Sequence, residues 1–274
     1  SVRDWRLQGT VLLCTFALFP LLGIGLHLLF RNLFPNALFG EDLWAGILFL
    51  CCLPSTVQSS IALTSIARGN VPAAICAATV SNIAGIALTP LLTGIVLGHV
   101  GAGHSPLESV LDVAKELLLP FILGQILQKW IGPIVKRHKF LISFTDRGSI
   151  VVVVYTAFSS AVVEGIWHRV SPLHLLEVAL LDSFMLALVL VASHFMGKGM
   201  NQSTENSIAL QFCGSKKSLA SGVPMASVLF PSASVGIIVL PLMIYHQIQL
   251  FTCTLLARHY GKRIGLETHS KPHS

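Results

Sequence analysis

Residues 206–229 read NSIALQFCGSKKSLASGVPMASVL and place two adjacent lysines inside an otherwise apolar stretch. At 1.5 Å per helical residue, this stretch is long enough to cross the roughly 30 Å of hydrocarbon in a bilayer. A lysine at the bilayer centre costs roughly 2.5–3.5 kcal/mol on insertion scales. Two such residues in a row, Lys216 and Lys217, therefore indicate a functional centre within a membrane-spanning segment.

The helix is expected to break close to these lysines. Neighbouring residues on a regular helix point about 100° apart, so two ammonium groups share one small pocket only where the helix is interrupted. Gly214, Gly222 and Pro224 supply helix-breaking residues on either side. Snorkelling to the membrane surface suits at most one of the two lysines. An ammonium held at this depth can neutralise an anionic substrate or occupy the place of a bound cation.

The composition of the whole chain is that of a membrane protein. Of its 274 residues, 53% are hydrophobic and 11% are charged, whereas a soluble domain carries about 25% charged residues. Eight stretches are long and apolar enough to span a bilayer. They lie near 10–30, 44–66, 72–98, 110–131, 148–167, 174–196, 206–229 and 233–257. We predict an all-α integral membrane fold that forms a single transmembrane unit, followed by a disordered cytoplasmic tail over 258–274.

The distribution of lysine and arginine predicts the orientation. When the connections between spans alternate sides, thirteen of the 18 basic residues fall on one side of the membrane, three on the other and two inside a span. Cytoplasmic loops carry the excess of basic residues, so the first residue and the C-terminus are both expected in the cytoplasm. This placement also accounts for the net charge of +6 without a nucleic-acid partner.

The span at 44–66 is the second one with an unusual density of polar residues. Pro54 removes a backbone donor and frees carbonyl groups near Cys51. Carbonyl oxygens beside hydroxyl groups form the oxygen-rich kind of pocket that holds Na⁺, although ordinary helix packing through Ser and Thr is an alternative. The two polar spans and the span at 72–98 contain the candidate substrate- or ion-binding residues. They are Gln58, Ser59, Ser60, Thr79, Asn82, Gln211, Ser215, Lys216, Lys217 and Ser218.

The two polar spans begin two similar hairpins. Each continues through a short turn into a more apolar helix that carries a proline, Pro90 in one and Pro241 in the other. The two copies start on opposite sides of the membrane, which is the inverted topology of many secondary transporters. Chance similarity of two membrane hairpins is the alternative. Equal halves need two more spans before residue 1, so we expect an N-terminally truncated chain of a ten-helix fold.

Other residue types give weaker indications. His246 is either a proton relay or a hydrogen-bonded structural residue, and Glu164 and Asp182 are expected to face the membrane interface. The six cysteines read as small buried hydrophobic residues. The sequence contains no nucleophile–base arrangement, no Gly-rich phosphate loop and no metal-ligand spacing. We therefore expect neither an enzyme nor a protein with a resident metal or cofactor.

Two motifs resemble a known family. The segment from Pro54 to Asn70 is similar to the first crossover motif of the bile acid:sodium symporter family, the solute carrier 10-like proteins. Residues 212–226, FCGSKKSLASGVPMA, resemble the orphan branch of that family, which includes the bacterial YfeH-type proteins. The similarity continues over essentially the whole chain, through LPLMIYHQIQL at 240–250.

The resemblance implies a ten-helix fold of two inverted five-helix repeats, located in a cell membrane, here a bacterial inner membrane. Two unwound helices cross near the midplane, and a six-helix core moves against a panel of four helices. By this resemblance residues 10–98 form the second part of repeat one, 110–167 form panel helices and 174–257 contain the core helices of repeat two.

The resemblance also implies where sodium ligands should lie. One sodium site of the family falls on Ser59 and Ser60, with Thr79 beside the nearest fifth-helix positions. A glutamate shared by both sodium sites falls on Gln211, a further glutamine falls on Ser215, and an asparagine falls on Lys216. A carboxylate is thus missing and a cation is added. Sodium coupling is therefore in doubt for this chain.

Two hypotheses from different classes follow. The first is a secondary active transporter, a symporter-like protein for a small organic anion, in which a lysine supplies the charge that Na⁺ supplies in the relatives. A desolvated lysine also loses its proton readily, so H⁺ is an alternative coupling ion. The second is a non-transporting membrane regulator linked to calcium homeostasis, as the orphan branch suggests. A membrane-embedded enzyme is a distant third.

Overall fold

The computed structural model describes residues 5–33, 40–97, 119–138 and 171–269, together with isolated positions between 115 and 165. Within these residues all regular structure is helical. Four helical segments are long and apolar enough to cross a membrane: Trp5–Phe30, Val71–Leu97, Pro172–Gly199 and Ser234–Lys262. They belong to the rod formed by α1 (Trp5–Leu13), η1 (Cys14–Leu18) and α2 (Phe19–Leu33), to α5 (Val71–Leu97), to α10 (Pro172–Gly199) and to α13 (Ser232–His269).

The two polar spans fold as broken helices. The first consists of α3 (Glu41–Cys52) and α4 (Gln58–Ile66), and the second of α11 (Thr204–Gly214) and α12 (Leu219–Leu229). At 1.5 Å per residue, each half reaches only about 14–18 Å, roughly half the thickness of the hydrocarbon layer. The interruption of each span therefore lies deep between its two ends.

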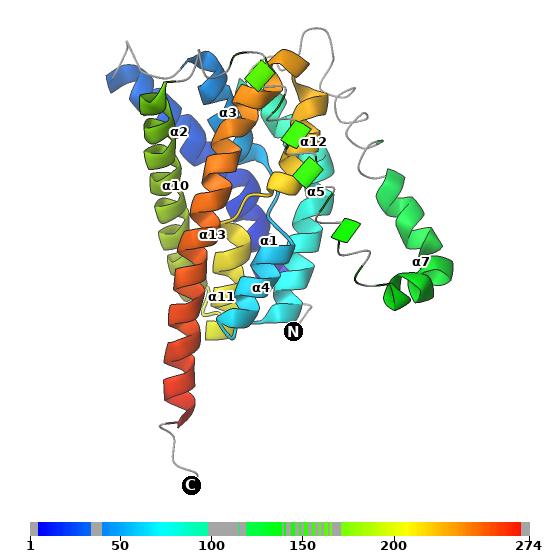
Figure 1. The fold of residues 1–274 in the computed structure, drawn as a ribbon. Coiled ribbons are helices and arrows are strands. Elements are labelled where there is room, and N and C mark those ends of the chain that lie inside the picture. The colour runs from blue at the N-terminus through cyan, green and yellow to red at the C-terminus, as the bar shows by residue number, and fades with distance from the viewer. Residues whose placement is uncertain are drawn as a thin grey trace.

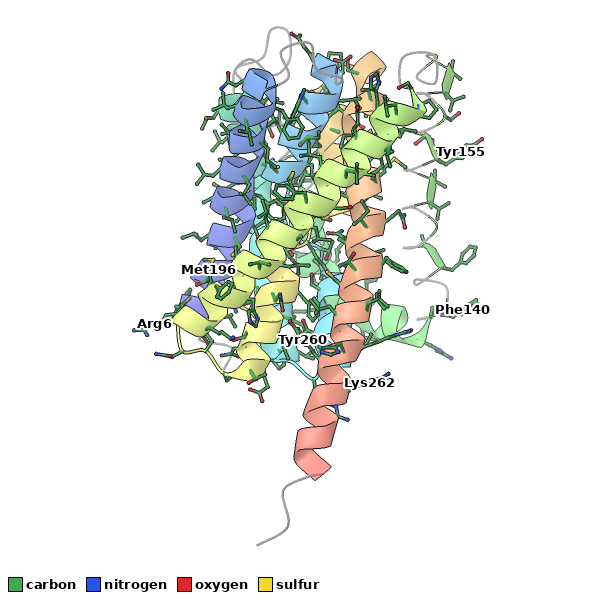
Figure 2. All side chains as sticks on the ribbon, turned by 90° about the vertical axis from the view of Figure 1, so that its left-hand side faces the viewer. Arg6, Phe140, Tyr155, Met196, Tyr260 and Lys262 are labelled. Carbon is green, nitrogen blue, oxygen red and sulfur yellow. The ribbon has the colours of Figure 1, made fainter. Side chains whose placement is uncertain are left out.

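The broken helices lie inside a bundle made by the long helices (Figure 1). α13 packs against α3, α4, α10 and α12, while α5 packs against α1, α3, α4 and α11. The helix α7 (Leu119–Arg137) lies to one side of the bundle, beyond α5 (Figure 1). Phe140 and Tyr155 lie beside the bundle, at the right of the view in Figure 2.

Basic residues gather at one end of the bundle. Arg6 and Lys262 lie at the same end, close to Met196 and Tyr260 (Figure 2). The turn after α4 and the turn before α11 also meet each other, since the Asn70 amide donates to the Glu205 carbonyl at 3.0 Å. Arg6, near the start of the chain, and Lys262, near its end, thus lie at the same end of the bundle (Figure 2).

Several boundaries differ from the sequence prediction. Of the span expected at 110–131, the structure describes the part in α7, which ends at Arg137. The span expected at 148–167 lies largely outside the described residues. The tail was expected to be disordered from 258, but α13 continues to His269. Contacts hold this helix past the apolar run, since the Tyr260 hydroxyl donates to Gln211 Oε1 at 2.9 Å.

A glycine permits the closest approach of α3 to α13. A Cβ atom on Gly46 would lie 2.5 Å from the carbonyl oxygen of Ile238 and 3.0 Å from Cγ of Pro241. The first of these neighbours is a backbone atom, which cannot rotate away. Glycine at this position therefore lets α13 pack directly on α3, the helix that ends at Cys52 before the break.

We expect Gly46→Ala to lower the thermal unfolding temperature of the detergent-purified protein. Overpacking of this kind destabilises by about 1–3 kcal/mol, and here the added methyl group displaces a neighbouring helix. Gly25→Ala is the matched control, because a Cβ on Gly25 would meet no atom within 4 Å. An equal unfolding temperature for the two variants would contradict the close approach of α3 and α13.

Candidate functional site at the crossing of the broken helices

The break after α3 leaves three carbonyl groups without their helical partners. In a continuous helix the amides of residues 55, 56 and 57 would bond the carbonyls of residues 51, 52 and 53. Here the Ser55 amide instead donates to Ser81 Oγ at 3.1 Å. The Cys52 carbonyl accepts from Thr89 Oγ1 at 2.9 Å. The carbonyls of Cys51 and Leu53 are free to bind a group from outside the helix.

That group is the side chain of Lys217. Its Nζ donates to the Cys51 oxygen at 2.8 Å and to the Leu53 oxygen at 2.7 Å. The third donor reaches the Thr15 carbonyl at 2.8 Å. The ammonium also lies 4.1 Å from the ring centroid of Phe19, in the geometry of a cation–π contact. Lys217 is completely buried, and all three of its donors are used.

The Thr15 carbonyl is available for a local reason. The Phe19 amide bonds the Cys14 carbonyl, five residues earlier, so the helix has π geometry at this point. In this register the next amide would belong to residue 20 and would reach Thr15. Residue 20 is a proline, which has no N–H. A single proline in the first span therefore leaves open the third acceptor for the ammonium.

The second break is satisfied by side chains of α13. The Tyr245 hydroxyl donates to the Ser215 carbonyl at 2.8 Å. The amide side chain of Gln249 pairs with the backbone of Lys217 twice, accepting from its N–H and donating to its carbonyl, both at 2.9 Å. Ser218 starts α12 by accepting from the Ser221 amide at 3.2 Å. These contacts fix the backbone on both sides of the two lysines.

The two breaks also bond directly to each other. The Ser218 amide donates to the Pro54 carbonyl at 3.0 Å, and Ser55 Oγ donates to the Cys213 carbonyl. On the α5 side, Asn82 joins the two breaks by donating to the Ser55 carbonyl at 2.8 Å and accepting from Ser221 Oγ at 2.9 Å. The crossing is therefore a single hydrogen-bonded unit.

A chain of hydroxyl groups extends the crossing along α4. Ser59 Oγ donates to Thr56 Oγ1 at 2.8 Å, and Thr56 Oγ1 lies 2.8 Å from Ser60 Oγ. Ser60 in turn donates to the Phe212 carbonyl at 3.1 Å. Because the Ser60 hydroxyl uses its hydrogen to bond the Phe212 carbonyl, Thr56 is the donor in the bond between Thr56 and Ser60. The hydroxyls predicted as ion ligands are thus directed toward the end of α11.

Lys216 has a different environment from its neighbour. Its side chain is also completely buried, but Nζ makes no hydrogen bond. The ammonium lies 5.7 Å from the ring centroid of Phe212, which belongs to the buried cluster that also contains Cys253. A buried cation without hydrogen-bonding partners is unfavourable by several kcal/mol unless an anion compensates it. Of the two lysines, only Lys216 is left to bind a ligand.

Some predicted site residues lie elsewhere. Gln58 and Thr79 are exposed, whereas Asn82 and the buried Ser81 face the break. Gln211, at the position of the family's carboxylate, donates to the Leu190 carbonyl at 3.0 Å and accepts from Tyr260. Both ends of this side chain are therefore held by protein groups.

Two of the four predicted helix breakers do not break a helix. Pro54 lies in the first break and Gly214 ends α11, but Gly222 and Pro224 lie inside α12. Pro224 is the sixth of the eleven residues of α12, where it removes one helical hydrogen bond without ending the helix. Gly222 has a packing role, since a Cβ there would lie 2.5 Å from Leu242 Cδ2 and 2.7 Å from Leu53 Cδ1.

Asp182 was expected at the membrane interface, and this prediction is wrong. The residue lies within α10 and is completely buried, and neither carboxylate oxygen has a hydrogen-bonding partner. Its place eleven residues into a long apolar helix already indicates burial. Sequence reasoning also left Tyr245 and Gln249 without a role, although their spacing of four residues puts them on one face of α13.

The fold and the crossing define an α-helical, multi-pass membrane protein built around two interrupted helices. Comparison with known proteins agrees with this class and makes it more specific. The profile of the SBF-like CPA transporter family (DUF4137) matches residues 1–262. The chain therefore belongs to this transporter family, and membership implies a transport role rather than an enzymatic one.

Individual relatives give the same assignment. An uncharacterised protein of Pseudomonas aeruginosa is 50% identical over 263 residues, which is 96% of this chain and 78% of the relative. The Escherichia coli protein YfeH, whose name describes it as a candidate symporter, is 49% identical over 94% of this chain and 76% of its own length. Sodium/bile acid cotransporter 7 of Danio rerio is 28% identical over 88% of this chain and 71% of its own length.

The two lysines should respond oppositely to replacement by methionine. Lys217→Met leaves three buried carbonyls without donors, each worth about 1–3 kcal/mol, and should lower the thermal unfolding temperature strongly. Lys216→Met removes an uncompensated buried charge and should leave the unfolding temperature equal or raise it. Differential scanning fluorimetry of the purified variants measures both. Equal destabilisation by the two substitutions would contradict the assigned contacts.

Proposed function

We propose that the protein is a secondary transporter of a small organic anion, with Lys216 as the group that binds the anion. The observation that supports this proposal is the buried Lys216 ammonium, which makes no hydrogen bond beside a crossing in which the neighbouring groups are paired. Because an isolated cation in a membrane interior is strongly unfavourable, an anionic ligand would compensate it. A transporter family and a relative named as a candidate symporter support the same function.

Lys217 is proposed to act as a tethered cation. Three carbonyl oxygens at 2.7–2.8 Å around one nitrogen resemble the oxygen environment that a monovalent cation would require. An ammonium that is part of the chain occupies this place permanently and is not carried across the membrane. Since Gln211 also has no charge and is bonded at both ends, we propose that transport does not depend on Na⁺.

The complete fold is proposed to contain ten helices in two inverted repeats. Support comes from the way each break is satisfied by the helix that follows it in the chain. Ser81, Asn82 and Thr89 of α5 bond the break between α3 and α4. Tyr245 and Gln249 of α13 bond the break between α11 and α12. The same relation in two copies fits an inverted repeat. We further propose, from its basic residues, that the C-terminus lies in the cytoplasm of a bacterial inner membrane.

The crossing is closed, and this observation also favours a second candidate function. Lys216, Lys217 and Ser215 have no exposed surface. A membrane regulator that no longer transports would show the same dry crossing. For a transporter, the closed crossing is one stage of a cycle in which access alternates between the two sides. Only a measurement of movement across the membrane separates the two functions.

Uptake into proteoliposomes tests the transport function directly. We expect the wild-type protein to take up at least one member of a panel made of taurocholate, a steroid sulfate and short-chain carboxylates, at the same rate with Na⁺ or with choline. Lys216→Met should reduce this uptake at least tenfold, because the group that compensates the anion is removed. Lys262→Met, an exposed lysine at the end of the bundle, is the control.

Two results would overturn the proposal. Strict Na⁺ dependence would contradict the tethered cation, and absence of uptake for every anion in the panel would favour the regulator.

A small cation should replace the missing ammonium of Lys217→Ala. The substitution leaves the three carbonyls in place and opens space for a free ion beside them. We expect methylammonium or Na⁺ to raise the unfolding temperature of Lys217→Ala in a saturable manner, while the wild-type protein responds no more than it does to choline. An equal rise in the unfolding temperatures of Lys217→Ala and the wild-type protein would show that the carbonyls do not form a cation site.

A further inference from the structure

A fixed ammonium cannot drive the accumulation of an anion. Lys217 is bonded to three carbonyls of the chain and does not leave the protein. An inside-negative potential opposes anion entry by about 2.3 kcal/mol per charge for every 100 mV. Uptake against this field needs a mobile cation that binds the protein with the anion. If Na⁺ is excluded by the tethered lysine, another site must bind the mobile cation.

The described part of the chain contains one buried acidic side chain, Asp182. It is completely buried, and neither carboxylate oxygen accepts or donates a hydrogen bond. It lies about 15 Å along α10 from the first residue of the helix, so it is deep in the membrane. Intramembrane carboxylates are rare and mark ion or proton pathways.

The surroundings of Asp182 favour a proton over a metal cation. Its helical neighbours Val178, Leu181, Met185 and Leu186 belong to the main apolar cluster. A metal ion would need several oxygen ligands, whereas a proton needs only the carboxylate. An ionised carboxylate with no partner is strongly disfavoured in such a place, and taking up a proton removes the charge.

Two titratable groups interact electrostatically with the carboxyl group. They are the Cys51 thiol of α3 and the Tyr245 hydroxyl of α13. The Tyr245 hydroxyl is already bonded to the Ser215 carbonyl, and Cys51 supplies one of the three carbonyls that bind Lys217. α11 also packs against α10, and its Glu205 is exposed at the far end of that helix. The Asp182 carboxyl group itself is bonded to neither break.

We infer that Asp182 is the proton-binding group that couples anion transport to the proton gradient. This inference rests on the proposed function. Asp182 takes up one proton on the side where the anion enters and releases it on the other side, so one proton and one monovalent anion cross together without net charge. The membrane potential then no longer opposes uptake.

Proteoliposomes that support both exchange and accumulation provide the test. Exchange of labelled for unlabelled anion, with no pH gradient, measures transport itself. Accumulation driven by an acidic exterior measures coupling, and a gradient of one pH unit corresponds to about 1.4 kcal/mol, or about tenfold accumulation for one proton per anion. The probe is the anion from the panel above that the wild-type protein takes up.

Asp182→Asn is the informative variant, because asparagine has the shape of the protonated acid. We expect it to exchange anions while losing the tenfold accumulation in response to a pH gradient. Glu205→Gln, an exposed carboxylate on the neighbouring helix α11, should retain both activities. Infrared difference spectra should also lose the band of a protonated carboxyl group in Asp182→Asn and keep it in Glu205→Gln.

The outcomes separate the two proposals. Exchange without any response to the pH gradient in the wild-type protein, or accumulation that persists in Asp182→Asn, overturns the role of Asp182 and leaves anion transport intact. Lack of exchange for every anion overturns the proposed function and the coupling with it. If Asp182→Asn fails to exchange but the infrared band is still present in it, another group binds the proton and the inference is wrong.

Discussion

The bonding of the Lys217 ammonium to three backbone carbonyls is the constraint on which the crossing depends. Inside a membrane no water is available to satisfy the carbonyls that a broken helix exposes, so the protein must supply the donors. An ammonium has three donors and no acceptor, and here its three partners come from two different spans. The three hydrogen bonds thereby reduce both the cost of burying the charge and the cost of leaving three carbonyls without donors.

The sequence contains enough information to predict the long apolar helices of the described residues and the place of the first break, but not the partners of the breaks. Apolar run lengths depend only on local composition, and Pro54 necessarily interrupts its helix. The acceptors of Lys217 lie between 164 and 202 residues away along the chain, and such pairings follow only from the packing of the helices. The assignment of Asp182 to the interface is an error of a different kind, because its position eleven residues into a long apolar helix does indicate burial.

Local rules also failed where position within a helix decides the outcome. Gly222 and Pro224 were both read as helix breakers, yet inside α12 the proline removes one hydrogen bond and the glycine provides a close contact. Thr79 was grouped with Asn82, and three residues do bring a helix back to within about 60° of the same direction. The phase of α5 turns Ser81 and Asn82 toward the break and leaves Thr79 exposed.

The contacts of the two adjacent lysines constrain how the protein can move. Lys217 belongs to the second break and bonds the first span and both sides of the first break. Ser218 and Ser55 add direct bonds between the breaks. Separating these segments would expose several carbonyls at once in a medium without water. The first span and both breaks must therefore move as one rigid body. The Lys216 side chain, in contrast, makes no hydrogen bond and can reorient without opening the crossing. A change of access around Lys216 is consequently compatible with a crossing that stays intact.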